Sequence, residues 1–182
     1  EINEGDWSSD VCSSDLQVVT LMAEHLKTIN SSKAADYDKN AEAYKKQIEE
    51  TDTWAKQETA KIPEERRVLV TGHDAFNYFG RAYGIEIHAT DFVTSESDMS
   101  ADDIAELADL IAKHKLPVIF QDNLKNPQAI QSVKEAVAAK GWQVEVSDKK
   151  LYADSLGDEA GVDSYLGVMK HNVTTIVEAL SR

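Results

Sequence analysis

The sequence has 182 residues, of which 33 are acidic and 19 are basic, so its formal net charge is −14 at neutral pH. Proteins that bind nucleic acid need clustered Lys and Arg to neutralise phosphate, and this balance therefore excludes nucleic acid as the expected partner. A cation ligand is compatible with the acidity, but the simpler explanation is a well-solvated surface.

The N-terminal stretch differs in character from the rest of the chain. Residues 6–16, DWSSDVCSSDL, correspond codon by codon to one reading frame of a common sequencing adapter, and they contain the only cysteine, Cys12. We therefore expect residues 1–16 to be non-native or disordered and leave them out of fold reasoning. The remaining residues, roughly 165, have the size of one α/β domain with a sizeable core.

Helical patterns dominate residues 17–63. The first helix is expected over 17–29, where apolar residues recur at the i, i+3, i+4 spacing of an amphipathic helix, namely Val18, Leu21, Met22, Leu26 and Ile29. Residues 33–62 carry only a thin apolar stripe among Glu and Lys, so a helix there buries little and suits a strut between two bodies. Pro63 marks the end of this helix.

After Pro63, strand and helix patterns alternate. Short β-branched runs predict strands over 67–71, 85–90, 116–120 and 142–146, and helical patterns occupy 73–83, 100–111, 127–139 and 162–180. Such alternation implies a parallel sheet covered on both faces, with ligands outside the carboxyl ends of the strands. We therefore predict an α/β fold in which residues 64–182 form a four-stranded parallel sheet flanked by helices.

Two ionisable residues fall at expected strand ends. His73 lies just after the first strand, and Asp154 lies in a loop after the fourth. An imidazole and a carboxylate from separate loops can share a divalent metal, but a partly exposed His and a turn-capping Asp are equally ordinary roles. The remaining histidines fall within expected helices or strands, where surface or packing roles are favoured: His25, His88, His114 and His171.

Three segments carry a family resemblance. Residues 70–84, VTGHDAFNYFGRAYG, together with 151–157, LYADSLG, and 165–177, YLGVMKHNVTTIV, resemble the metal-specific substrate-binding proteins of ABC importers. Proteins of that family deliver manganese, zinc or iron to a membrane transporter. The resemblance covers nearly all of residues 17–182.

This resemblance implies a two-lobed architecture with the metal held between the lobes. The segment 33–62 would contain the long rigid helix that connects the lobes, and residues 64–182 would form the C-terminal lobe. His73 would be the third metal ligand and Asp154 the final carboxylate. Two further ligands, usually His, would belong to an N-terminal lobe, and adapter-like sequence stands in place of one of them. We therefore expect the chain to be the C-terminal half of such a protein.

The implied function is capture of a divalent transition metal outside the cytoplasm, in the periplasm or as a cell-surface lipoprotein, for a membrane ABC permease. We expect a monomer and no enzymatic activity. Ligand softness does not separate manganese, zinc and iron for a His and Asp set. One alternative is a metal-dependent hydrolase in which Asp74 is the base, although a convincing third protein ligand is missing. Another is a surface adhesion protein.

Overall fold

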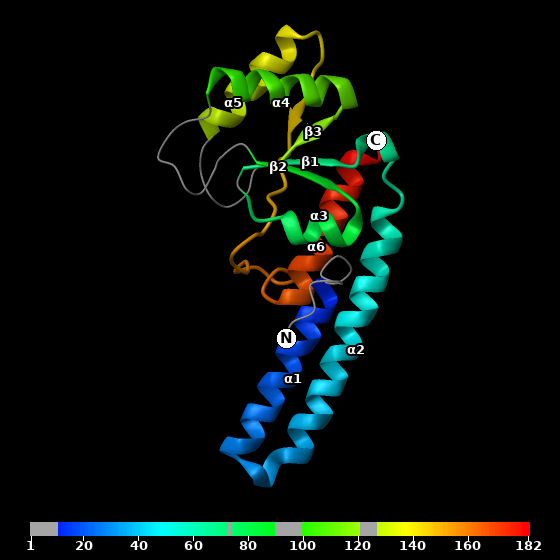
Figure 1. The fold of residues 1–182 in the computed structure, drawn as a ribbon, viewed down its shortest axis with the longest axis vertical. Coiled ribbons are helices and arrows are strands. Elements are labelled where there is room, and N and C mark those ends of the chain that lie inside the picture. Colours follow the sequence, from blue (N-terminus) through cyan, green and yellow to red (C-terminus); the bar gives the residue numbers. More distant parts are fainter. Residues whose placement is uncertain (1–10, 73, 90–99, 121–126) are drawn as a thin grey trace, which may run out of the picture.

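The computed structural model describes residues 11–72, 74–89, 100–120 and 127–182. In Figure 1, two N-terminal helices form a hairpin that extends away from an α/β body built by the remaining elements. In chain order the elements are α1 (Val11–Ile29), η1 (Ser31–Lys33), α2 (Ala34–Thr59), η2 (Glu64–Arg66), β1 (Val68–Thr71), α3 (Asn77–Tyr83), β2 (Glu86–Ala89), α4 (Ala101–His114), β3 (Val118–Ile119), α5 (Pro127–Ala139), β4 (Glu145–Val146) and α6 (Tyr165–Leu180).

Helix α2 is the long charged helix that the sequence predicts. Its 26 residues extend for about 39 Å at 1.5 Å per residue. Its buried side is a narrow stripe, made up of Ala41, Ile48, Thr51, Ala55 and Thr59. The C-terminal half of this stripe joins the core of the α/β body through Ala55, and Ile62 follows just after the helix. The hairpin is therefore anchored to the body at one end only.

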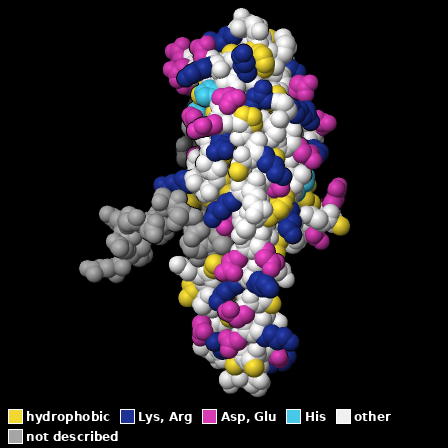
Figure 2. Space-filling view, turned by 90° about the vertical axis from the view of Figure 1, so that its right-hand side faces the viewer, with side chains coloured by type: hydrophobic (Ala, Val, Ile, Leu, Met, Phe, Trp, Pro, Cys, Tyr) yellow, Lys and Arg dark blue, Asp and Glu magenta, His cyan; other side chains and the backbone are white. Residues whose placement is uncertain are grey.

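Opposite charges are interspersed along the hairpin, as Figure 2 shows for one face of the molecule. The Lys27 Nζ atom lies 2.8 Å from the Asp38 Oδ1 atom and so joins α1 to α2. Within α2, Lys56 lies 2.8 Å from Asp52 one turn earlier. Exposed pairs of this kind contribute at most about 1 kcal/mol each, so they solubilise the hairpin more than they stabilise it.

Helix α1 begins at Val11 and not at Gln17, so residues 11–16 of the adapter-like stretch are helical where we expected disorder. The side of α1 that is wholly or partly buried comprises Asp15, Leu16, Val19, Ala23 and Lys27. The amphipathic stripe on which the prediction rested lies outside this side. Its members are exposed by 39 to 69%, namely Val18, Leu21, Met22, Leu26 and Ile29. The helix was predicted correctly, but the face that it buries within this chain was not.

The α/β body contains four short strands among the described residues. They form two parallel pairs, β1 with β2 and β3 with β4, and not one continuous ladder. A backbone hydrogen bond from the Phe120 N–H to the Val70 carbonyl, 2.9 Å long, sets the end of β3 beside β1. The expected parallel α/β class is confirmed, with shorter strands than the apolar runs suggested.

Both faces of these strands are covered. In β1, Val68 and Val70 pack with α4 and α5, whereas Leu69 packs with α3 and α6. This alternation follows from the opposite directions of successive side chains in a strand. Figure 1 shows α4 and α5 on one side of the strands and α3 and α6 on the other, between the strands and the hairpin.

Local signals fix several helix ends. Ser100 and Asp103 form a reciprocal capping box at the start of α4, where the sequence predicts a helix to begin. Gly84 ends α3 with a φ of 67°, a left-handed conformation that favours glycine. Within the described ranges, none of the helices has both the length and the apolar character required to cross a membrane.

Candidate metal centre

The first predicted ligand, His73, lies outside the described residues, and the structure shows only the residues on either side of it. Before it, Thr71 ends β1, is buried, and pairs in parallel register with Ala89 of β2. After it, Phe76 is buried and packs edge-on against Phe79 with the ring centroids 6.3 Å apart.

The second predicted ligand, Asp154, is exposed. It comes after β4 in the chain, as we expected, and eight residues separate it from the end of that strand at Val146. The chain re-enters the core at Leu151, which is completely buried, and Asp154 follows three residues later. Leu151 packs in the same apolar cluster as Val173 and Ile176 of α6, so it is α6, and not β4, that supports this segment.

The flanks of the two predicted ligands meet in one apolar cluster. This cluster contains Leu69 of β1, Phe76 and Leu151, and the partly buried side chains Ala75 and Ala153 pack against it. Ala75 lies two residues after His73, and Ala153 directly precedes Asp154. Both segments therefore pack against the same core cluster, which is the cluster that covers one face of β1.

Helix α6 forms hydrogen bonds with the backbone just before Asp154. The side-chain amide of Asn172 accepts a hydrogen bond from the Tyr152 N–H at 3.0 Å and donates one to the Tyr152 carbonyl at 2.7 Å. The neighbouring His171 ring lies 2.9 Å from the Lys150 carbonyl oxygen, and its centroid is 5.3 Å from that of Tyr152. The buried amide of Asn172 thus satisfies both backbone hydrogen-bonding groups of Tyr152, which a neighbouring strand would otherwise do.

The other end of the Asp154 loop is also fixed. The Gly157 N–H donates to the Val162 carbonyl at 2.7 Å. A Cβ at position 157 would lie 2.5 Å from the Val162 Cγ2 atom and 2.7 Å from the Tyr152 ring. The loop that carries Asp154 is thus anchored before and after the carboxylate.

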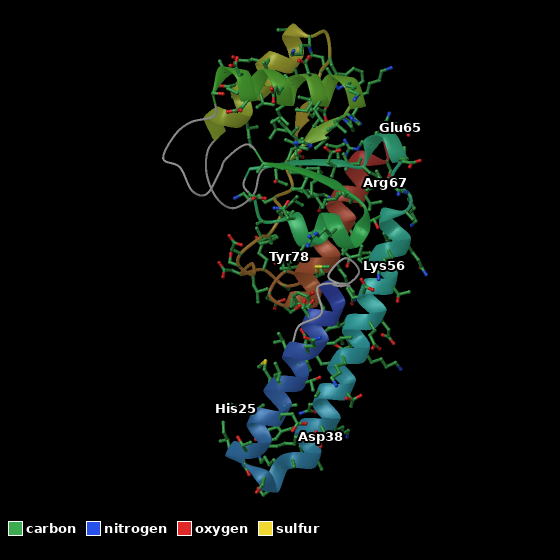
Figure 3. The ribbon with its side chains drawn as sticks, in the orientation of Figure 1. His25, Asp38, Lys56, Glu65, Arg67 and Tyr78 are labelled. Carbon is green, nitrogen blue, oxygen red and sulfur yellow. The ribbon has the colours of Figure 1, made fainter. Side chains whose placement is uncertain are left out.

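Three of the remaining histidines have structural partners. The His88 ring lies 2.8 Å from a Glu86 carboxylate oxygen on the same strand, and the His114 ring lies 2.7 Å from the Glu65 carbonyl oxygen. His171 supports the Lys150 backbone, as described above. In Figure 3, His25 lies on α1 toward the end of the hairpin that is far from the strands.

A second acidic position lies at the junction of the hairpin and the body. The Tyr165 hydroxyl donates a hydrogen bond to the Asp15 carboxylate. Burial raises the pKa of Asp15, and this hydrogen bond opposes the rise only in part. Asp52 accepts a 3.2 Å hydrogen bond from the Tyr83 hydroxyl at the same junction. These contacts join helices and do not assemble a ligand set.

Across the described ranges, no three His, Cys, Asp or Glu side chains gather in a group that could hold a metal ion. The ligands that the sequence assigns to this chain are two, and the structure describes one of them. Zinc sites in proteins have three or four protein ligands. A site built on His73 and Asp154 therefore requires further ligands, or water, to complete its coordination shell.

Comparison with known proteins identifies the family. A family model described as "ZnuA: Zinc-uptake complex component A periplasmic" matches residues 15–179. The chain belongs to this family, and the resemblance stated above is confirmed.

Individual relatives agree with this assignment. The zinc-binding protein TroA of Treponema pallidum is 37% identical over 165 residues, which cover 90% of this chain and 53% of TroA. The manganese-binding lipoprotein MntA of Bacillus subtilis is 36% identical over 145 residues, covering 79% of this chain and 47% of MntA. The chain thus spans about half the length of the curated relatives that it matches.

Solved structures share the fold. The periplasmic zinc-binding protein TroA from Treponema pallidum superposes with a TM-score of 0.84 at 35% identity, over 97% of this chain and 63% of that chain. The Fe(III)-bound YtgA from Chlamydia trachomatis superposes with a TM-score of 0.72 at 29% identity, over 87% of this chain and 57% of that chain.

Proposed function

We propose that residues 64–182 are the metal-binding lobe of an extracytoplasmic solute-binding protein and that His73 and Asp154 are its ligands. The cargo is a divalent transition metal, and the partner that receives it is a membrane ABC permease. The observation that carries this proposal is the convergence of both ligand segments, through Ala75 and Ala153, on one apolar cluster. Family membership supplies the class of function.

The chemistry of the two side chains limits the cargo. Imidazole nitrogen and carboxylate oxygen, without a thiolate, suit borderline to hard ions, so manganese, zinc and iron are all admissible. The names of the relatives agree, since they include a zinc-binding and a manganese-binding protein. Binding requires a neutral imidazole and an ionised carboxylate, and capture therefore weakens on acidification.

The hairpin has a different role in this proposal. Helix α2 contains the rigid connection between two lobes. The exposed apolar stripe of α1 packs against another part of the intact protein, outside residues 64–182. Support comes from the narrow buried stripe of α2 and from the coverage of only about half of each relative. The two remaining ligands come from that other part.

A hydrolase on the same strands is less well supported. Its base would be Asp74, but the Asn77 side-chain amide donates a hydrogen bond to this carboxylate at the start of α3. Relatives of this chain bear the names of metal-binding proteins. No feature of the described residues favours an adhesion role.

Calorimetric titration of the chain with Zn²⁺ tests the proposal. We expect weak binding, because two ligands leave water to complete the shell, and we expect His73→Ala or Asp154→Ala to abolish it. Matched controls are His25→Ala, on the hairpin, and Asp158→Ala, which alters another exposed carboxylate of the same loop. Binding that survives both ligand substitutions contradicts the proposal. Tight binding that is lost in His73→Ala would instead show that this chain holds a complete site.

A further inference from the structure

The loop that carries Asp154 depends on a residue that is neither a ligand nor in the loop. Asn172 lies in the second turn of α6 and is only 4% exposed. A buried side-chain amide is costly unless both its donor and its acceptor are used. Here both are used by a single residue, Tyr152, which lies two positions before Asp154.

This arrangement fixes the direction in which the chain leaves the core. Leu151 is anchored by apolar packing, which resists displacement but does not define how the following peptides are rotated. The two hydrogen bonds to Tyr152 define that rotation, because the N–H and the carbonyl of one residue must both point at the amide of Asn172. The rotation at Tyr152 therefore sets the course of the backbone that follows and the position of the Asp154 Cβ atom.

The loop that carries Asp154 is also fixed at its other end, at Gly157. Gly157 contacts the Tyr152 ring and Val162, so the four residues between Tyr152 and Gly157 span two fixed points. In a loop this short, a rotation at Tyr152 moves the carboxylate directly. Loss of a group that hydrogen-bonds a metal ligand typically costs about 10- to 100-fold in affinity, and we expect loss of a support for the ligand's backbone to act in the same direction.

We infer that Asn172 is a positioning residue for the metal site: its buried amide sets the backbone at Tyr152 and thereby aims the Asp154 carboxylate at the ion. This inference rests on the proposed function, because it assumes that Asp154 is a ligand. Asn172 itself contacts no ion. It acts on affinity through the geometry of the loop.

Two measurements on the full chain test the inference, with Mn²⁺ alone as the probe. Amide hydrogen exchange of the metal-free protein reports on the clamp, and Mn²⁺-dependent broadening of backbone NMR signals gives the dissociation constant even for a weak site. The variants are Asn172→Leu, which removes both hydrogen bonds at similar volume, and Asn172→Asp, which keeps an acceptor for the Tyr152 N–H. Val168→Ala is the matched control, because it removes buried methyl groups from α6 one turn before Asn172, at a residue outside the apolar cluster that contains Leu151.

We expect slow exchange at the Tyr152 amide of the unmodified chain, retained in Asn172→Asp and in Val168→Ala and lost in Asn172→Leu. We expect the dissociation constant for Mn²⁺ to rise about tenfold or more in Asn172→Leu, by less in Asn172→Asp, and less than twofold in Val168→Ala. Fast exchange at the Tyr152 amide of the unmodified chain overturns the inference, whether or not the variants fold.

Mn²⁺ binding by the Asp154→Asn variant distinguishes a failure of this inference from a failure of the proposed function. If Asp154→Asn weakens Mn²⁺ binding while folded Asn172→Leu binds like Val168→Ala, only the positioning role is wrong. If Asp154→Asn leaves the dissociation constant unchanged, the proposed site is wrong and the positioning role is lost with it.

Discussion

Gly157 lies against Tyr152 so closely that a Cβ at position 157 would be 2.7 Å from the Cε1 atom of the Tyr152 ring. The same Cβ would lie 2.5 Å from Val162. Real Cβ atoms do not approach other heavy atoms to these distances, so glycine is required here by space. The requirement links the two ends of the loop that carries Asp154.

Gly157→Ala should therefore destabilise the protein. Overpacking at a closed position costs about 1 to 3 kcal/mol, because Tyr152 or Val162 must move. Urea denaturation followed by circular dichroism measures the change in the free energy of unfolding. Gly141→Ala is the control, because no atom lies within 4 Å of its added Cβ, although its φ of 82° gives that variant its own backbone strain. A Gly157→Ala variant as stable as the unmodified chain would show that the Tyr152 ring is free to move.

The two sides of the hairpin should respond differently to truncation. Ile48 of α2 is 4% exposed, and Ile48→Ala should cost about 2 to 5 kcal/mol through lost apolar contact and a cavity. Leu21 of α1 is 68% exposed, so Leu21→Ala should change the free energy of unfolding by no more than about 0.5 kcal/mol. Thermal melts of both variants measure the contrast. A large loss in Leu21→Ala would mean that this face of α1 is covered in solution.

The Asp15 carboxylate, at the junction of the hairpin and the body, should make the stability of the protein depend on pH. Burial raises the pKa of Asp15 above its ordinary value of 3.8, so folding favours the protonated form. The stability that this preference gives is fully present below the unfolded-state pKa and is lost as the pH rises through the higher folded-state pKa. Asp15→Asn should therefore raise the Tm at pH 7 and leave it nearly unchanged at pH 3. Melting curves at the two pH values measure the difference, and an equal shift at both would refute the assignment to burial.

The sequence was sufficient for most of the secondary structure. The predicted helix end at 83 and the predicted helix start at 100 are correct because Gly84 and the Ser100–Asp103 capping box act through local geometry. The helix before Pro63 ends earlier than expected, at Thr59. Periodicity was less informative about burial. It located α1 but could not say that Leu21 and Met22 face away from α2, because the face that a helix buries depends on what packs beside it.

For the site, position in the sequence was a partial guide. His73 and Asp154 were singled out as residues after strands, yet Asp154 follows a segment held by α6 and not by β4. Asn172 was missed, since an amide on a helix usually faces water. The available signal was its place on one face of α6 with Val168 and Ile176, four residues away on either side, where a polar side chain needs a buried partner.

The central claim is that His73 and Asp154 bind one ion together. Crystals of the chain soaked in Zn²⁺, with diffraction data collected at the zinc absorption edge, test it most directly. The account predicts one anomalous peak about 2.0 to 2.2 Å from both a His73 ring nitrogen and an Asp154 carboxylate oxygen, with other atoms completing the shell. An anomalous peak elsewhere, with His73 and Asp154 at opposite ends of the strands, would contradict it.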